Sequence, residues 1–105
     1  MTEDEAKFGV GQLIHHRLFE YRGVVVDVDA HFEGTEEWYE QVARSRPPKD
    51  RPWYHVLPHA SAHTTYVAER NLEPDDELEP IYHPMLSDFF EDFRDGRYVV
   101  ARRVN

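Results

Sequence analysis

Histidine is the first side chain to test for chemistry, because neutral imidazole is the commonest metal ligand and this chain of 105 residues has seven. His55, His59 and His63 are spaced by four, the interval that would align them on one face of a helix. Pro58 and strand-like flanks argue against a helix there, although His55 and His63 could still approach each other across a hairpin. Without cysteine or an HExxH pattern, we predict no metal site and no cofactor.

No nucleophile lies in a sequence context that would activate it. Ser45, Ser61 and Ser87 fall in turns or at a helix start, and none lies in a GxSxG elbow. The glycines form neither a GxGxxG nor a Walker sequence, and the many carboxylates lie on segments that we expect to be solvated. We therefore predict no catalytic residue and a protein that is not an enzyme.

The formal net charge of −9 constrains the partners. Proteins that bind nucleic acid usually carry a basic stripe, because neutralising phosphates supplies much of the affinity. Here two acidic blocks dominate: Glu73, Asp75, Asp76, Glu77 and Glu79, then Asp88, Glu91, Asp92 and Asp95. We interpret them as solvated, solubilising surface, and the alternative is attraction to a basic partner.

Two stretches combine residues suited to binding. The first places basic side chains beside an aromatic ring, as in phosphate contact with base stacking, and comprises Arg44, Arg46, Lys49, Arg51 and Trp53. Its alternative is a solvated proline-rich loop followed by a core tryptophan. The second is the apolar stripe Phe89, Phe90 and Phe93, a surface for protein contact if it is exposed and ordinary core if it is not.

The elements that must position these residues begin with a strand over residues 23–29. Its period-two pattern predicts one buried face carrying Val24, Val26 and Val28, and an opposite face carrying Val25, Asp27 and Asp29. Gly9, Gly11 and Gly23 are expected where the chain bends sharply or another backbone approaches closely.

The spacing of apolar residues and the positions of capping residues, prolines and glycines predict the other elements. Thr35 is a good N-cap for a short helix over residues 34–44, and a proline-rich linker follows it. His83-Pro84 opens an amphipathic helix that carries the phenylalanine stripe and ends at Gly96. The remaining predictions are strands over 12–18, 53–57 and 63–69, a hairpin turn at 59–62, a single helical turn at 70–72, an acidic loop to 80, and a last strand or ordered tail over 98–104.

The predicted fold is mainly β with short helices: a small antiparallel barrel with an inserted helix and a C-terminal amphipathic helix. We expect residues 1–6 to be a flexible acidic N-terminus and residues 7–105 to form one domain. The acidic start is unlike a signal peptide, and no apolar run is long enough to cross a membrane. We therefore expect a cytoplasmic protein.

Three segments together resemble the heat shock protein HspQ family, also called the YccV-like or hemimethylated DNA-binding family. They are KFGVGQLIHHRLFEYRGVVVDVD at 7–29, PWYHVL at 52–57 and YVAERNL at 66–72, with the His83-Pro84 helix start in addition. The resemblance implies an SH3-like barrel, a cytoplasmic location and a role in heat stress. It further implies promotion of the degradation of denatured or unstable proteins, such as the replication initiator DnaA, and enhanced substrate choice by the ATP-dependent protease Lon.

These considerations leave three hypotheses. The first is a non-enzymatic adaptor whose partners are an ATP-dependent protease and its substrates. The second is a DNA-binding module that recognises hemimethylated sites through residues 44–51, against the repulsion expected for a chain of charge −9. The third is a homo-oligomer built through barrel edges and an apolar helix.

Overall fold

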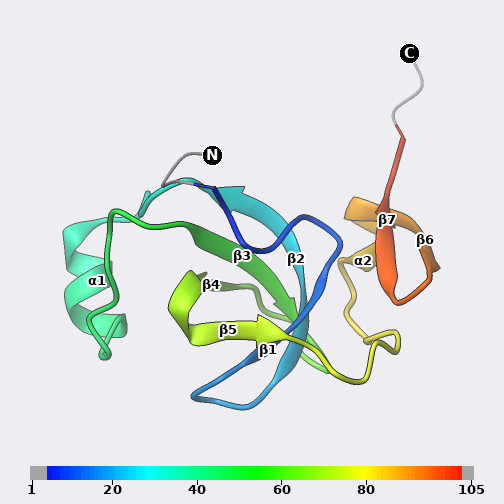
Figure 1. Ribbon diagram of the computed structural model, residues 1–105, viewed down its shortest axis with the longest axis horizontal. Helices are drawn as coiled ribbons and strands as arrows, with labels where there is room; N and C mark the ends of the chain where they lie inside the picture. Colours follow the sequence, from blue (N-terminus) through cyan, green and yellow to red (C-terminus); the bar gives the residue numbers. More distant parts are fainter. Residues whose placement is uncertain (1–4, 103–105) are drawn as a thin grey trace.

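A five-stranded antiparallel sheet forms most of the molecule in the computed structural model, which describes residues 5–102 (Figure 1). Its strand order is β4-β3-β2-β1-β5, so the long strand β2 lies at the centre. The strands are β1 (Leu13–His16), β2 (Arg22–Asp29), β3 (Trp53–Pro58), β4 (Thr65–Ala68) and β5 (Leu72–Pro74). The prediction of a mainly β, antiparallel fold is confirmed.

The two edges of this sheet come close together without joining. No ladder pairs β4 with β5 among the described residues, although the 3₁₀ turn η1 (Glu69–Asn71) connects them directly. The Tyr21 hydroxyl, in the turn between β1 and β2, instead forms a hydrogen bond with Thr65 Oγ1 at 2.8 Å. The arrangement is therefore an SH3-like curved sheet that side chains bridge along one seam.

A β-bulge in β2 overturns the predicted alternation of that strand. The register with β3 shifts between Val25 and Asp27, which inserts one extra residue and reverses the facing of the residues after it. Val24 and Val26 therefore pack in one apolar cluster, whereas Val25 and Val28 pack in another. Because both faces are covered, the prediction of one buried and one solvated face is wrong.

The inserted helix α1 (Glu36–Val42) forms where the sequence predicts a helix, and it is shorter at both ends. The Thr35 hydroxyl accepts a hydrogen bond from the Trp38 backbone N–H at 3.1 Å, so the predicted N-cap is confirmed. Glu36 and Glu37 occupy the first turn, where the helix dipole favours negative charge. The helix ends at Val42, which is exposed at the surface.

The predicted C-terminal amphipathic helix is wrong in its extent. Only one turn, α2 (Leu86–Phe89), is helical, and the chain then forms a hairpin from β6 (Phe90–Arg94) and β7 (Arg97–Val100). Asp95 and Gly96 have φ values of 54° and 80°, which is the positive-φ geometry that an Asp-Gly hairpin turn requires. The Asp-Gly signal and the β-forming aromatic residues therefore prevail over the helical spacing of the phenylalanines.

Three apolar clusters hold these parts together. One lies inside the curved sheet around Ile14 and Tyr54, one joins the sheet to the β6–β7 hairpin around Leu13 and Phe90, and one joins it to α1 around Trp53. Figure 1 shows α1 and the hairpin at opposite ends of the sheet. The clusters thus divide the molecule into a helix-covered end and a hairpin-covered end.

The acidic stretch predicted as loop begins with β5 and is then fastened to the sheet. Arg22 Nη2 lies 2.9 Å from Asp75 Oδ2, and Arg22 Nε lies 2.8 Å from Glu77 Oε2. The Asp75 side chain is 4% exposed and that of Arg22 is 17% exposed, so this ion pair is largely buried. Part of the acidic block therefore has a structural role, in addition to solvation.

The ends of the chain bear on three remaining expectations. Ala6 packs against the inner cluster, and residues 1–4 of the predicted flexible N-terminus lie outside the described residues. The predicted last strand is confirmed as far as Val100, and residues 103–105 of its range are outside the described part. Within residues 5–102, no helix is both long enough and apolar enough to cross a membrane.

Gly11 offers a direct test of this packing. Its φ is +91°, and a Cβ atom there would lie 2.2 Å from the Tyr98 backbone oxygen. We expect Gly11→Ala to lower the free energy of unfolding by about 2–4 kcal/mol, since it combines strain with overpacking. Gly9→Ala is the control, because a Cβ there meets only the Arg97 side chain at 3.8 Å. Equal urea midpoints for the two variants would contradict this packing.

Candidate functional site

The predicted basic stretch is largely neutralised by local contacts. Arg46 Nη1 lies 2.9 Å from Glu40 Oε2, and Lys49 forms an ion pair with Glu36. The Lys49 ammonium also lies 4.3 Å from the centre of the Tyr39 ring. These contacts tie the linker to α1, so they leave less free positive charge than the sequence suggests.

Trp53 lies in the core, as the alternative interpretation anticipates. Its side chain is buried at 1% exposure, and its indole Nε1 donates a hydrogen bond to the Pro48 carbonyl at 3.1 Å. Its ring faces therefore contact other aromatic residues, and they are not accessible to a nucleic-acid base in this conformation. Of the predicted DNA-contacting set, Arg44, Arg46 and Arg51 are exposed at the surface.

The phenylalanine stripe also packs as core. Phe90 is buried, and Phe89 and Phe93 are partly buried in the cluster that joins the hairpin to the sheet. The Phe93 ring meets the Tyr98 ring edge-on at 4.7 Å. The surface that the sequence offers for protein contact at these residues is used within the molecule.

An open cleft of about 870 Å³ lies at the α1 end of the sheet. One wall is α1 with Trp38 and Val42, and the other is the β1–β2 turn with Leu18 and Phe19. The edge strand β4 lies between the two walls. In Figure 1 these walls lie away from the β6–β7 hairpin, so the cleft belongs to the helix-covered end.

Packed aromatic rings build the α1 side of the cleft. Tyr66 of β4 packs against Trp53 at 5.1 Å between ring centres and against Trp38 at 5.8 Å. The Tyr66 hydroxyl donates to Asp29 Oδ2 at 2.7 Å, and His55 Nε2 lies 3.0 Å from the same oxygen. Burial, and then the hydrogen bond to the Asp29 carboxylate, raise the pKa of Tyr66, so its ring stays neutral and fixed.

A buried histidine shapes the opposite wall. The backbone N–H groups of Leu18 and Phe19 both donate to His16 Nδ1 at 3.1 Å, so that nitrogen is held unprotonated. The Phe19 ring stacks on the imidazole at 4.7 Å, yet the Phe19 side chain remains 75% exposed and Leu18 remains 55% exposed. The turn therefore presents two large apolar side chains to solvent.

One arginine lines the cleft, and two others are held by carbonyl groups of the loop and turn beside it. Arg44 lines the cleft, the Arg70 guanidinium donates to the Ser45 carbonyl, and Arg17 Nη1 donates to the Arg70 carbonyl at 3.5 Å. No carboxylate lies within ion-pair distance of these three guanidinium groups in the described residues 5–102. We call Arg17, Arg44 and Arg70 the arginine rim. It is a local positive site on an acidic protein.

The histidines contact groups other than those that spacing suggests. Opposite His55 across the ladder is Tyr66, and the His63 carbonyl accepts a hydrogen bond from His83 Nε2. Asp27, Asp29 and His55 are brought together, with one ligand atom from each within 4.8 Å of the others. Asp29 already holds His55 and Tyr66 by hydrogen bonds, and this support of the aromatic wall accounts for the cluster. The prediction that the chain carries no metal stays a prediction.

Comparison with known families decides where the chain belongs. The sequence model of a family described as hemimethylated DNA-binding protein YccV-like matches residues 6–97, which is most of the chain. The chain belongs to the YccV-like family. The resemblance inferred from the sequence is thereby confirmed, and the matched range spans both walls of the cleft.

Sequence reasoning misses most of the cleft in this YccV-like chain. It assigns no binding role to Leu18, Phe19 or Trp38, although two large apolar residues beside a turn are a signal of an exposed binding surface. Arg17 and Arg70 lie far apart in the sequence, and only the pairing of β1 with β5 brings them together.

The pH response of the β1–β2 turn follows from His16. Burial, and then the charge of His15, lower the His16 pKa below its usual 6.5, so the unfolded chain takes up this proton at a higher pH than the folded one does. Stability is therefore full above about pH 7 and falls as the pH drops through 6.5.

We expect the urea midpoint of the parent protein to decrease as the pH is lowered from about 7.5 to about 5. The decrease should be smaller in His16→Asn. Asparagine keeps an acceptor near the position of Nδ1 but cannot be protonated. Parallel pH profiles for the parent and His16→Asn would show that this histidine does not control the turn.

Proposed function

We propose that this YccV-like protein is a non-enzymatic adaptor that acts in the cytoplasm under heat stress. It binds denatured or unstable proteins, such as the replication initiator DnaA, and promotes their degradation by an ATP-dependent protease such as Lon. Its contribution is binding energy and positioning, and the protease supplies the bond chemistry.

The single observation that carries this proposal is the exposed apolar cleft. Leu18, Phe19 and Val42 are 55%, 75% and 53% exposed, and all three border one hollow of about 870 Å³. Apolar side chains gathered around a cavity at the surface mark a site for protein or ligand, since isolated exposed residues would not converge in this way. Denatured proteins differ from native ones in displaying apolar segments, which is the property that this cleft can recognise.

Phe19 and Tyr82 provide a matched test. Both are exposed aromatic residues, at 75% and 77%, and each packs on a histidine ring, but only Phe19 borders the cleft. With purified protease and an unstable substrate, we expect the parent protein to accelerate degradation. Phe19→Ala should require about tenfold more protein for the same acceleration, which corresponds to about 1.4 kcal/mol of binding, whereas Tyr82→Ala should match the parent.

Degradation at the same rate with and without the parent protein would refute the adaptor role. Equal losses in Phe19→Ala and Tyr82→Ala would keep an adaptor role but place its substrate site elsewhere. Thermal melts of both variants show whether either substitution acts by unfolding the protein.

Binding to hemimethylated DNA is the second candidate, and the description of the matching family favours it. Arg44 and the aromatic residues that line the cleft are of the types that contact phosphates and bases. The net charge of −9 opposes it, so a duplex would have to engage this small positive area against long-range repulsion.

For this second function we expect retardation of a hemimethylated duplex that weakens steeply with salt and exceeds that of the unmethylated duplex. Arg44→Gln should reduce the slope of log K against log salt by about 1, because one phosphate contact is lost. Arg94→Gln is the control, since Arg94 is paired with Asp92 in the hairpin. Equal or absent retardation of all duplexes excludes this function.

A further inference from the structure

The cleft encloses the free edge of a strand. Tyr66 and Ala68 pack on the α1 side of β4, whereas Val67 packs on the inner side, and all three line the hollow. A hollow lined from both faces of a strand must lie along the edge of that strand, because the side chains of neighbouring residues point in opposite directions. The cleft therefore runs beside the backbone of β4.

The register of the ladder indicates which backbone groups face this edge. The Glu69 N–H donates to the Pro52 carbonyl, one step beyond the pair of Trp53 and Ala68. Hydrogen-bonded and non-hydrogen-bonded pairs alternate in an antiparallel ladder, so the N–H and C=O of Tyr66 point away from β3. Within residues 5–102, no backbone hydrogen bond from another segment reaches Tyr66.

One end of this edge is occupied and the other is open. The loop after α1 closes over Ala68, where Ala43 packs against it and Ser45 contacts Arg70 and Asn71. Thr64 and Thr65, at the other end, line the open cleft, and the only side-chain hydrogen bond there within residues 5–102 is the one between Thr65 and the Tyr21 hydroxyl. An added strand would thus enter beside Thr64 and end near the arginine rim.

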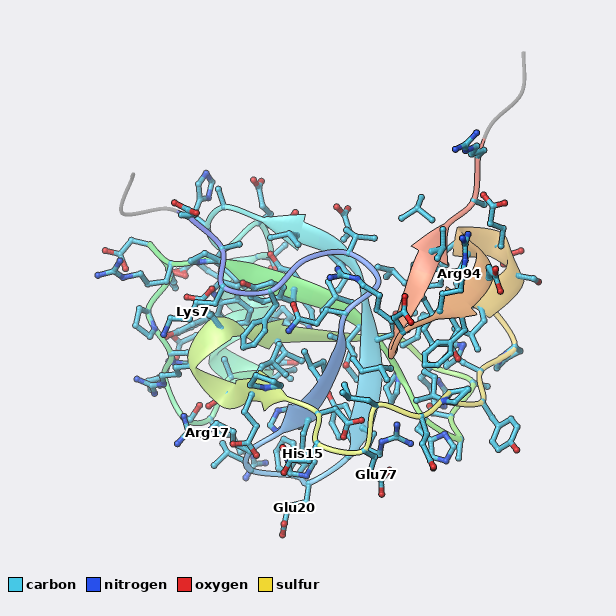
Figure 2. All side chains as sticks on the ribbon, turned by 45° about the vertical axis from the view of Figure 1, so that its right-hand side comes forward. Lys7, His15, Arg17, Glu20, Glu77 and Arg94 are labelled. Carbon is cyan, nitrogen blue, oxygen red and sulfur yellow. The ribbon has the colours of Figure 1, made fainter. Side chains whose placement is uncertain are left out.

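The charge at that end constrains the occupant. The arginine rim presents three guanidinium groups without carboxylate partners among the described residues, on a chain whose net charge is −9. Figure 2 shows Arg17 on the side of the molecule opposite the hairpin residue Arg94. Arg44 is the one member of the rim that lines the cleft, so this positive charge suits a single carboxylate, whereas a duplex backbone would need a longer basic stripe.

We propose that β4 receives an extended segment of a client polypeptide as an additional strand. Its backbone pairs with the outward groups of Tyr66, a large apolar side chain lies between Phe19 and Trp38, and an Asp or Glu side chain binds the arginine rim. This inference deepens the proposed adaptor function and rests on it for the class of ligand. It gives the cleft a sequence preference: an acidic residue beside alternating apolar residues.

Fluorescently labelled peptides of about ten residues, acetylated and amidated, test each component. The parent peptide alternates Phe or Leu with Thr and carries one Asp. We expect binding measured by anisotropy to weaken about tenfold when Asp becomes Lys and about tenfold when the apolar residues become Ser. N-methylation of the edge-facing amides should abolish binding, and the parent peptide should slow hydrogen exchange of the Tyr66 amide.

Matched protein variants complete the experiment. Arg17→Gln should weaken binding of the parent peptide but leave binding of the Lys-containing peptide unchanged. The Arg94→Gln variant should bind both peptides with the affinities of the parent protein. Equal affinity for all peptides, or unchanged exchange at Tyr66, overturns strand addition. If a peptide whose only anion is its C-terminal carboxylate binds more tightly than the parent peptide, the assignment of an Asp or Glu side chain to the arginine rim is overturned. If a short oligonucleotide displaces the labelled peptide at a lower concentration than unlabelled peptide does, the choice of a polypeptide as the ligand is overturned.

The two proposals fail separately. If the peptides do not bind but degradation is still accelerated, the adaptor role stands and strand addition falls. If the peptides bind as expected but degradation is not accelerated, strand addition stands and the protease role falls.

Discussion

The bent pairing of β2 with β3 is the constraint on which the rest of the structure depends. Alternation along β2 points Val24 and Val26 toward the hairpin-side cluster and Val25 toward the inner one. The bulge between Val25 and Asp27 then brings Val28 to the same inner cluster as Val25. The bulge also directs Asp29 toward Tyr66 and His55, so it sets the aromatic wall of the cleft.

The cleft exists because this curved sheet stops short of full closure. Side chains bridge the seam through Tyr21 and Thr65, whereas backbone pairing ends at β4. An unpaired edge is a risk for aggregation, and proteins usually shorten, charge or cover it. Here β4 is short, and α1 with its loop covers one end. The protein therefore retains only a limited, guarded edge, flanked by Phe19 and Trp38.

Local signals in the sequence predicted the fold well where one rule acted alone. Thr35 capping α1 and the strand at Trp53 needed no tertiary information. The phenylalanines of residues 89–93 have helical spacing but are also strand-forming aromatic residues. The Asp95-Gly96 turn favours the hairpin, and apolar periodicity alone does not reveal this preference. The candidate site was harder to predict. The cleft joins residues from the β1–β2 turn, α1 and β4, and only the completed sheet brings Phe19, Trp38 and Tyr66 together.

The buried pair of Arg22 and Asp75 bears on how the molecule responds to warming. Ionised groups lose hydration on burial, and that penalty shrinks as temperature rises, because the ordering of water around charge becomes less favourable. Apolar burial gains little over the same range. The contact between β2 and the acidic segment after β5 therefore contributes relatively more at elevated temperature. The proposed role under heat stress requires the acidic segment to stay anchored at elevated temperature, and this ion pair supports that.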